Sequence, residues 1–243
     1  MGYLTESIAM AARSKRCQSQ WGEHYAYCQQ SIQSAMQRCS THHTALIFGA
    51  GSLQDIPVKA LSEHFEKVLL VDVLFLKSAR KRVQAFSNIE LIEADITESM
   101  SLIFQGQTNL TLPKRWLDNQ NISLVVSLNL ITQLPLLPAK WLMKNRSVQE
   151  VDIERLSRQV IQQHLDYLCA FSGVVCLIAD RWDTEFDNTG QVLDEFDPWW
   201  EVEQPQTSKE WDWQVVPIGE GRSNSGQKNR VGVSFLNTEH IGA

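Results

Sequence analysis

The sequence predicts an α/β protein with a doubly wound, mostly parallel sheet. Short apolar runs alternate with helical patterns from residue 44 to residue 180, which favours parallel strands covered by helices on both faces. A glycine turn, Gly49-Ala50-Gly51, directly follows the first run. The last quarter instead holds two β patterns joined by a polar link, which is typical of an antiparallel hairpin. We therefore expect seven strands, of which the last two are antiparallel.

Composition is that of an ordinary globular enzyme. Of the 243 residues 43% are hydrophobic and 21% charged, and the formal net charge is -6. The acidic balance disfavours nucleic acid as a partner. No apolar run reaches the ~20 residues of a membrane span, and the N-terminus lacks the apolar core of a signal peptide, so we expect a cytoplasmic protein. The five cysteines are odd in number and form no CxxC pair, which predicts neither a zinc site nor a disulfide framework.

Residues 1–43 read as a helical extension that precedes the domain at 44–243. Residues 5–40 contain no proline and one glycine, Gly22, and their apolar positions recur at helical spacing. This face either packs on the domain or, through Trp21, His24 and Tyr25, covers a substrate pocket. Large aromatic side chains suit both roles.

The elements of the domain follow from apolar runs and from the residues that end them. The expected strands occupy residues 45–48, 68–71, 89–94, 122–129, 174–179, 211–217 and 230–236. The expected helices occupy residues 56–65, 74–86, 100–104, 114–118 and 148–171. Asp55 and Pro57 suit the start of the first of these helices, while Pro135 and Pro138 exclude a regular helix over 130–138. Residues 181–209 are acidic and aromatic, with little periodicity.

Candidate ligand-binding residues gather where the parallel strands end. The glycines allow the backbone to approach a ligand closely, and the N-terminus of the following helix would offer N–H groups to polar atoms. Asp72 ends the second strand about twenty residues later, where a carboxylate can accept hydrogen bonds from ribose hydroxyls. The pattern predicts a cofactor that contains a nucleoside.

The residues Gly49-Ala50-Gly51, Asp72, Asp95 and Ser127-Leu128-Asn129, in this order, resemble the Rossmann-fold (class I) S-adenosylmethionine-dependent methyltransferases. The resemblance covers residues 44–237. It implies a Rossmann-like seven-stranded sheet, S-adenosylmethionine as the cofactor, and methyl transfer as the reaction. The glycine turn would contact the methionine and ribose part, Asp72 the ribose hydroxyls and Asp95 the adenine amino group, while Asn129 would face the methyl group. The implied cofactor site comprises Gly49, Ala50, Gly51, Asp55, Asp72, Val73, Asp95, Ile96 and Asn129.

Two positions depart from the family pattern. Leu53 stands where a third glycine is usual, and Ile47 where an acidic residue is often found. An NAD(P)-dependent oxidoreductase is the weaker alternative, because its fingerprint requires a small residue where Gln54 stands.

The acceptor is expected to be a small or lipid-like molecule. The fourth strand ends in neutral polar residues rather than in an NPPY or DPPY tetrad, and the candidate catalytic residues are His24, Asn129 and Gln133. Asp180, Arg181 and Asp183 follow the fifth strand and can also contact an acceptor. A methyltransferase-like protein that has lost catalysis and serves in binding or regulation remains the second hypothesis. The pattern carries no signal for oligomeric state.

Overall fold

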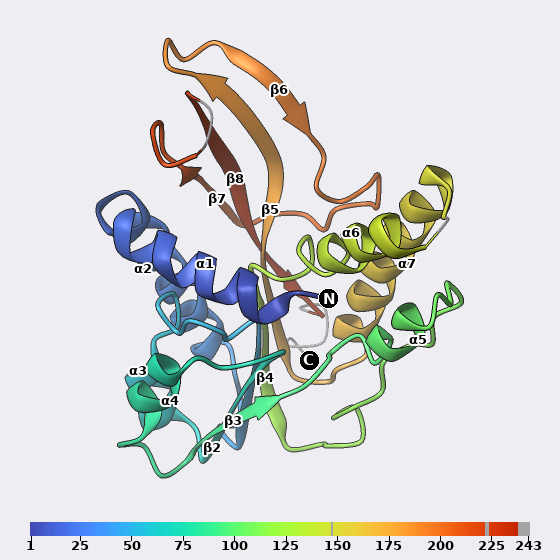
Figure 1. Cartoon of the computed structure of the whole chain (residues 1–243). Helices are drawn as coiled ribbons and strands as arrows, with labels where there is room; N and C mark the ends of the chain where they lie inside the picture. Colours follow the sequence, from blue (N-terminus) through green and yellow to red (C-terminus); the bar gives the residue numbers. More distant parts are fainter. Residues whose placement is uncertain (147, 222–223, 238–243) are drawn as a thin grey trace.

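The computed structural model describes residues 1–146, 148–221 and 224–237, and it contains one eight-stranded sheet in the order β3-β2-β1-β4-β5-β8-β7, with β6 paired to β5 (Figure 1). Strands β1 to β5 are parallel, and β8 runs antiparallel between β5 and β7. The fold class is therefore confirmed. The strands are β1 (Thr44–Phe48), β2 (Lys67–Asp72), β3 (Ile89–Glu93), β4 (Ile122–Leu128), β5 (Val174–Asp187), β6 (Val192–Phe196), β7 (Lys209–Val216) and β8 (Ser225–Leu236).

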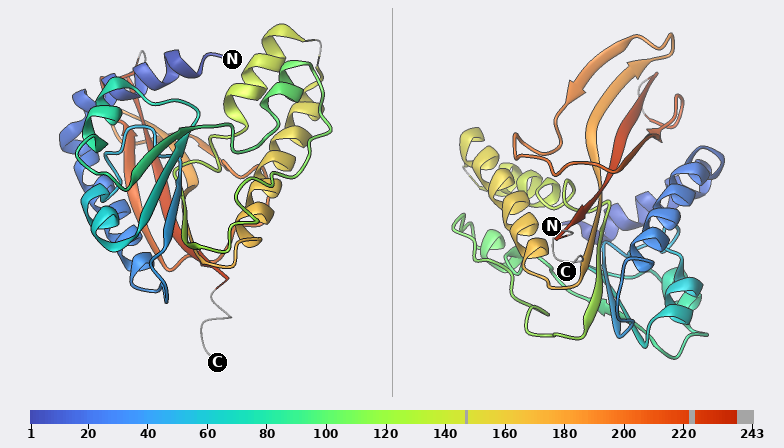
Figure 2. Two further views of the ribbon diagram at one scale, coloured as in Figure 1. Left: turned by 90° about the horizontal axis from the view of Figure 1, so that it is seen from below. Right: turned by 180° about the vertical axis from the view of Figure 1, so that it is seen from behind.

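Helices cover both faces of the sheet (Figure 2). One face carries α2 (Gln18–Met36), α3 (Val58–His64) and α4 (Lys77–Val83), and the other carries α5 (Met100–Phe104), α6 (Leu136–Asn145) and α7 (Glu150–Cys169). A separate apolar core lies under each set, since alternate side chains of a strand point to opposite faces. No helix in the described ranges is long and apolar enough to cross a membrane.

The two N-terminal helices differ in how they pack. Helix α1 (Tyr3–Arg16) buries none of its side chains and lies across the ends of the strands (Figure 1). Helix α2 belongs to the main core, because Cys28, Ile32 and Ala35 are fully buried against the sheet. The boundary between the helical extension and the domain at residue 43 stays a prediction, and α2 shares one core with the domain.

Helix α6 corrects the expectation drawn from two prolines. Pro135 is its N-cap and Pro138 lies in its first turn. The first four N–H groups of a helix have no partner within the helix, so proline removes no hydrogen bond there. Residues 115–118 form turns rather than the expected second helix.

An extension of the sheet formed by β5, β6 and β8 corrects the expectation for residues 181–209. Strand β5 continues to Asp187 and pairs with β6, and together with β8 it projects from the body as an arm (Figure 1). The exposed aromatic and acidic residues of this stretch form the strands of the arm, which lack a deep core and hence a clear apolar alternation. The polar link expected between the last two strands, residues 219–229, includes residues 222 and 223, which lie outside the described residues; β8 already begins at Ser225.

The segment after the glycine turn is a loop rather than a helix. Helix α3 begins only at Val58, with Pro57 as its N-cap and no side-chain cap, so Asp55 does not cap it. Leu53 within the loop is fully buried and has a left-handed backbone, with φ 61°. The expected helix N-terminus is therefore not adjacent to Gly51.

Candidate functional site

The glycine turn is held by the end of strand β2. The N–H groups of Gly49 and Ala50 donate to the carbonyl of Val71 at 3.0 and 3.2 Å, and that of Gly51 donates to Asp72 Oδ2 at 2.8 Å. A Cβ on Gly49 would lie 2.3 Å from the carbonyl oxygen of Leu128. Glycine is thus required here because the turn passes directly over strand β4.

Asp72 is the centre of this turn. The N–H of Val73 donates to its second oxygen, Oδ1, at 2.7 Å. Burial raises the pKa of Asp72, and backbone N–H groups of Gly51, Val73 and Leu74 counteract the rise. Each carboxylate oxygen can accept more than one hydrogen bond, and the residue is only half-buried. Asp72 therefore retains acceptor capacity for a pair of hydroxyl groups.

Asp95 lies at the end of the neighbouring strand, beside an open cavity of about 810 Å³. Its carboxylate accepts hydrogen bonds from the backbone and hydroxyl of Thr97 and, at 2.8 Å, from the N–H of Met100. These bonds order the loop that leads into α5. Ala94, Met100 and Phe104 add apolar lining, while Ile96 is buried in the core. The cavity has the size and mixed character of a small-molecule site.

Asn129 connects strand β4 to the helical extension. Its backbone N–H donates to the carbonyl of Ile178 at 2.8 Å, and its φ is 47°, a conformation that asparagine tolerates. Its side-chain nitrogen donates to Asp55 Oδ2 at 3.1 Å, while Oδ1 is buried without a hydrogen-bond partner among the described residues. Burial raises the pKa of Asp55 to about 6, and the hydrogen bond from Asn129 is among the effects that lower it.

His24 is held between two tryptophans of strand β7. Its ring stacks on Trp213 with 3.9 Å between centroids, and its Nδ1 lies 3.1 Å from Trp211 Nε1. An indole nitrogen can only donate, so Nδ1 of His24 accepts. Nε2 lies 3.2 Å from Asn129 Nδ2, which is also a donor, so both ring nitrogens face N–H groups. Burial lowers the pKa of His24 to about 3. His24 thus has no free basic nitrogen in this arrangement, which suits a donor or a positioning residue rather than a general base.

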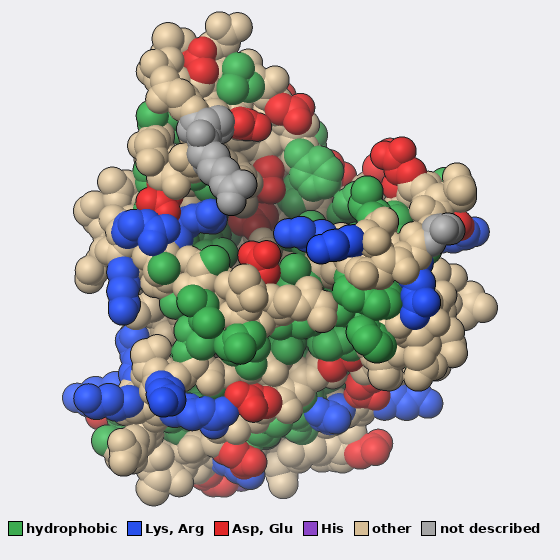
Figure 3. Space-filling view, in the orientation of Figure 1, with side chains coloured by type: hydrophobic (Ala, Val, Ile, Leu, Met, Phe, Trp, Pro, Cys, Tyr) green, Lys and Arg blue, Asp and Glu red, His purple; other side chains and the backbone are tan. Residues whose placement is uncertain are grey.

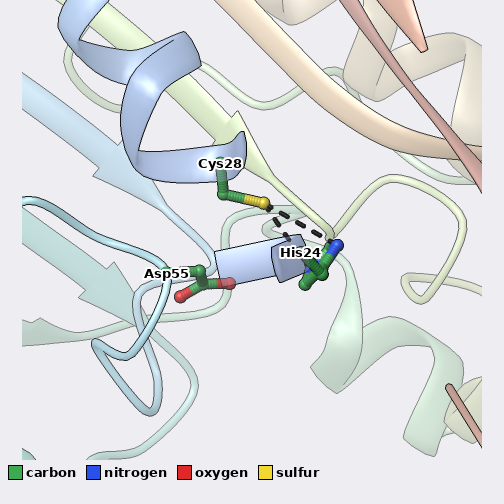
Figure 4. A group of neighbouring side chains, drawn as sticks. All are labelled: His24, Cys28 and Asp55. Atoms are coloured by element: carbon green, nitrogen blue, oxygen red, sulfur yellow. Dashed lines mark hydrogen bonds between the residues drawn. The ribbon is translucent and has the colours of Figure 1, made fainter. Parts of the chain in front are cut away.

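His24, Cys28 and Asp55 converge closely enough to suggest a metal site (Figure 4), with their ligand atoms all within 4.8 Å of one another. The hydrogen bonds oppose it. A metal on Nε2 would require a proton on Nδ1, which would face the N–H of Trp211. The sulfur of Cys28 lies 3.6 Å from Nε2 and 4.0 Å from Nδ1, so these ring nitrogens already have the thiol as a hydrogen-bonding neighbour. The cluster is not a preformed metal site, and all five cysteines of the chain are free.

Gln133 is exposed on the loop after β4, apart from the Asn129–His24 contact. It neighbours Asp180, whose pKa burial raises to about 6 and hydrogen bonds from Asn229, Thr132 and Gln133 lower. The catalytic assignments of His24, Asn129 and Gln133 stay predictions. Sequence reasoning missed Trp211 and Trp213 as partners of His24; their alternation in one strand was the available signal.

Together these residues lie along one edge of the sheet, at the carboxyl ends of β1 to β4. The fold is the one that the resemblance predicts. No family model matches the chain, and no curated protein matches it either.

Among solved structures, the chain is similar to the N-methyltransferase NodS from Bradyrhizobium japonicum WM9, with 12% identity, 85% of this chain and 94% of that chain covered, and a TM-score of 0.39. It is also similar to DhpI in a complex with SAM, with 12% identity, 98% and 83% coverage, and a TM-score of 0.39. DesVI of Streptomyces venezuelae shows 15% identity, 72% and 62% coverage, and a TM-score of 0.36. At these TM-scores the functional argument rests on the residues of the site.

Proposed function

We propose that the protein is an S-adenosylmethionine-dependent methyltransferase that acts on a small or lipid-like acceptor. The observation that carries the proposal is the placement of Asp72 and Asp95 at the ends of adjacent strands, with the glycine turn on one side and the 810 Å³ cavity against Asp95. In open α/β sheets of this kind, ligands bind in the crevice outside the carboxyl ends of the strands.

The residues present fit this cofactor. Asp72 would accept the ribose hydroxyls and Asp95, with Ala94 beside it, would hold the adenine in the cavity. The turn at Gly49 and Gly51 would lie against the methionine and ribose part, and Asn129 would border the reacting centre. When bound, the cofactor supplies an electrophilic methyl group, and the protein contributes mainly by positioning the acceptor.

The glycine turn also supports this cofactor over a dinucleotide. A pyrophosphate binds to free N–H groups of a helix that starts directly after the turn. Here the N–H groups of Gly49, Ala50 and Gly51 are already bonded to Val71 and Asp72, and α3 begins seven residues after Gly51. Adenosylmethionine carries no phosphate and does not need such a cradle.

Isothermal titration with S-adenosylhomocysteine tests the proposal. We expect binding by the full chain, and a loss of about tenfold or more in Asp72→Ala, because two hydrogen bonds to a charged acceptor disappear. Glu63→Ala is the matched control, since Glu63 is an exposed carboxylate on α3 whose only described ion pair is with Lys59. Equal affinities of Asp72→Ala and the unaltered chain would remove the ribose role from Asp72.

A binding protein that has lost catalysis is the second candidate, favoured by the absence of a free basic nitrogen on His24. It predicts binding of the cofactor without turnover. If the purified chain binds no adenosyl ligand even at millimolar concentration, the methyltransferase proposal fails.

A further inference from the structure

Two carboxyl groups lie close to the proposed methyl site, on the strand beside Asn129. Asp180 and Asp183 follow Ile178, whose carbonyl accepts the backbone N–H of Asn129. An irregularity in the pairing of β5 with β8 falls between Asp180 and Trp182, and Asp183 pairs with Asn229 of β8. Asn229 in turn pairs with Trp213, on which His24 stacks. The carboxyl pair on β5 is therefore connected to the His24 cluster through the paired strands β8 and β7.

Each of the two carboxyl groups has one buried oxygen without a hydrogen-bond partner among the described residues. Asp180 is 1% exposed, and Thr132 donates to its Oδ2 at 3.3 Å. Burial raises the pKa of this carboxyl group and hydrogen bonds from Asn229 and Gln133 also lower it, but Oδ1 has no hydrogen-bond partner among the described residues. Asp183 Oδ2 accepts a 3.4 Å hydrogen bond from Gln227, and its Oδ1 is likewise buried without a partner. Burial of a carboxylate without a cation or donors is costly, so such atoms point to a ligand that supplies them.

No cation of the described part of the chain forms an ion pair with either carboxyl group, although the charge of Arg181 partly offsets the rise that burial causes in the pKa of Asp180. Arg181, the nearest in sequence, donates instead to Ser234 Oγ and to the carbonyl of Pro205, and it lies over the ring of Trp199. Lys228 and Arg230 pair with Asp212. Burial, and then the neighbouring carboxylate of Asp180, raise the pKa of Asp183 to about 7. The pair consequently favours one negative charge over two near neutral pH.

The surface around the two carboxyl groups is also negatively charged. Residues 182–208 contain eight acidic residues and no lysine or arginine. Figure 3 shows a hollow between the arm and the helical body, with acidic side chains inside it. Such a surface raises the local concentration of small cations.

We propose that Asp180 and Asp183 bind the methyl acceptor, and that this acceptor is a cationic amine. The inference deepens the proposed function and rests on it. A carboxyl pair of one negative charge matches an ammonium group, which also supplies the N–H donors that the free oxygens lack. The aromatic rings of Trp211 and Trp213, which lie on strand β7 of the same sheet, favour a cation over an anion.

The reaction balances with the groups present. The ammonium nitrogen gives one proton to Asp183 and so exposes its lone pair. With the cofactor bound, this lone pair would form the C–N bond to the methyl group as the C–S bond of the sulfonium breaks, and the electron pair of that bond would stay on sulfur. The product is a methylated ammonium ion, and Asp183 returns its proton to solvent.

Benzylammonium is the probe, and benzyl alcohol is its neutral analogue. In calorimetric titrations of the full chain we expect saturable binding of benzylammonium, about tenfold or more above benzyl alcohol, and a comparable loss in Asp183→Asn and Asp180→Asn. Asp194→Asn, an exposed acid of β6 on the same arm, should bind as the unaltered chain does. Asparagine keeps the shape and removes a buried charge, and thermal melting verifies that each variant folds.

S-Adenosylhomocysteine titrations of the same samples separate the two proposals. If it binds to the chain and to Asp183→Asn equally while benzylammonium binds neither or both alike, the amine site is overturned and the proposed function stands. If benzylammonium binds in an Asp183-dependent manner but no adenosyl ligand binds, the amine site stands and its role as a methyl acceptor site is overturned.

Discussion

Leu53 gives the sharpest test of the local structure, because two opposing effects meet at one residue. The side chain is fully buried, and the backbone is left-handed with φ 61°. An L-residue in this conformation costs about 1–2 kcal/mol, whereas a buried leucine is worth about 2.7–5 kcal/mol against alanine. The second effect is larger, so leucine is tolerated in this left-handed conformation.

The substitutions Leu53→Ala and Leu53→Gly separate the two effects. Both lose the buried side chain, and we expect each to lower the free energy of unfolding by about 3–4 kcal/mol. Compared with the alanine variant, the glycine variant loses about 0.8 kcal/mol more of the free energy of unfolding for the missing methyl group. It loses about 0.4–1 kcal/mol more because glycine gives the unfolded chain more conformational freedom. It also relieves the strain of about 1–2 kcal/mol. The two variants should therefore have nearly equal stability.

Leu61 is the matched control, since it is fully buried in helix α3 with ordinary helical geometry. There alanine should be more stable than glycine by about 2 kcal/mol, because glycine is also a poor helix former. Urea unfolding followed by tryptophan fluorescence measures all four variants. If the alanine–glycine difference is the same at 53 and 61, the assigned left-handed conformation of Leu53 is wrong.

Three further predictions concern the site. Gly49→Ala should destabilise the chain and weaken cofactor binding, because its Cβ would lie 2.3 Å from the carbonyl oxygen of Leu128; unchanged urea midpoint and affinity would contradict this. Trp211→Phe removes the donor to Nδ1 of His24 but keeps an aromatic side chain there, so the pKa of His24, which burial lowers to about 3, should stay well below its ordinary value; a histidine NMR titration that gives an ordinary pKa would contradict burial as the cause. Asp180 has a folded pKa raised to about 6, so the folded state holds a proton that the unfolded state releases, and this contribution to stability is lost as the pH rises from about 4 to about 6. Asp180→Asn should accordingly gain stability over the unaltered chain across that window, by about 3 kcal/mol at most, and a pH-independent difference between the two would exclude the raised pKa.

The local sequence pattern was enough to predict the sheet and most of the residues at the carboxyl ends of its parallel strands. Strands β1, β2 and β4 and the first half of β5 are apolar runs buried on both faces, and the alternation of strands with helices leaves few topologies. The acidic residues that end β2 and β3 follow directly, because parallel strands end at one edge. The same rules failed at Pro135 and Pro138, where proline starts α6, and at Asp55, whose carboxyl group binds Asn129 rather than a helix terminus.

Tertiary structure decided the chemistry of the side chains. His24 looked like a candidate base in a helical pattern, and only the structure shows that the indole of Trp211, 187 residues away in the chain, donates to its Nδ1. Asp180 and Asp183 looked like ordinary polar residues after a strand, and only the continuation of β5 into a paired arm buries an oxygen of each without a hydrogen-bond partner among the described residues. Sequence spacing sets which residues share an edge or a face, whereas protonation and unmet hydrogen bonds depend on contacts between distant segments, which have no local signature.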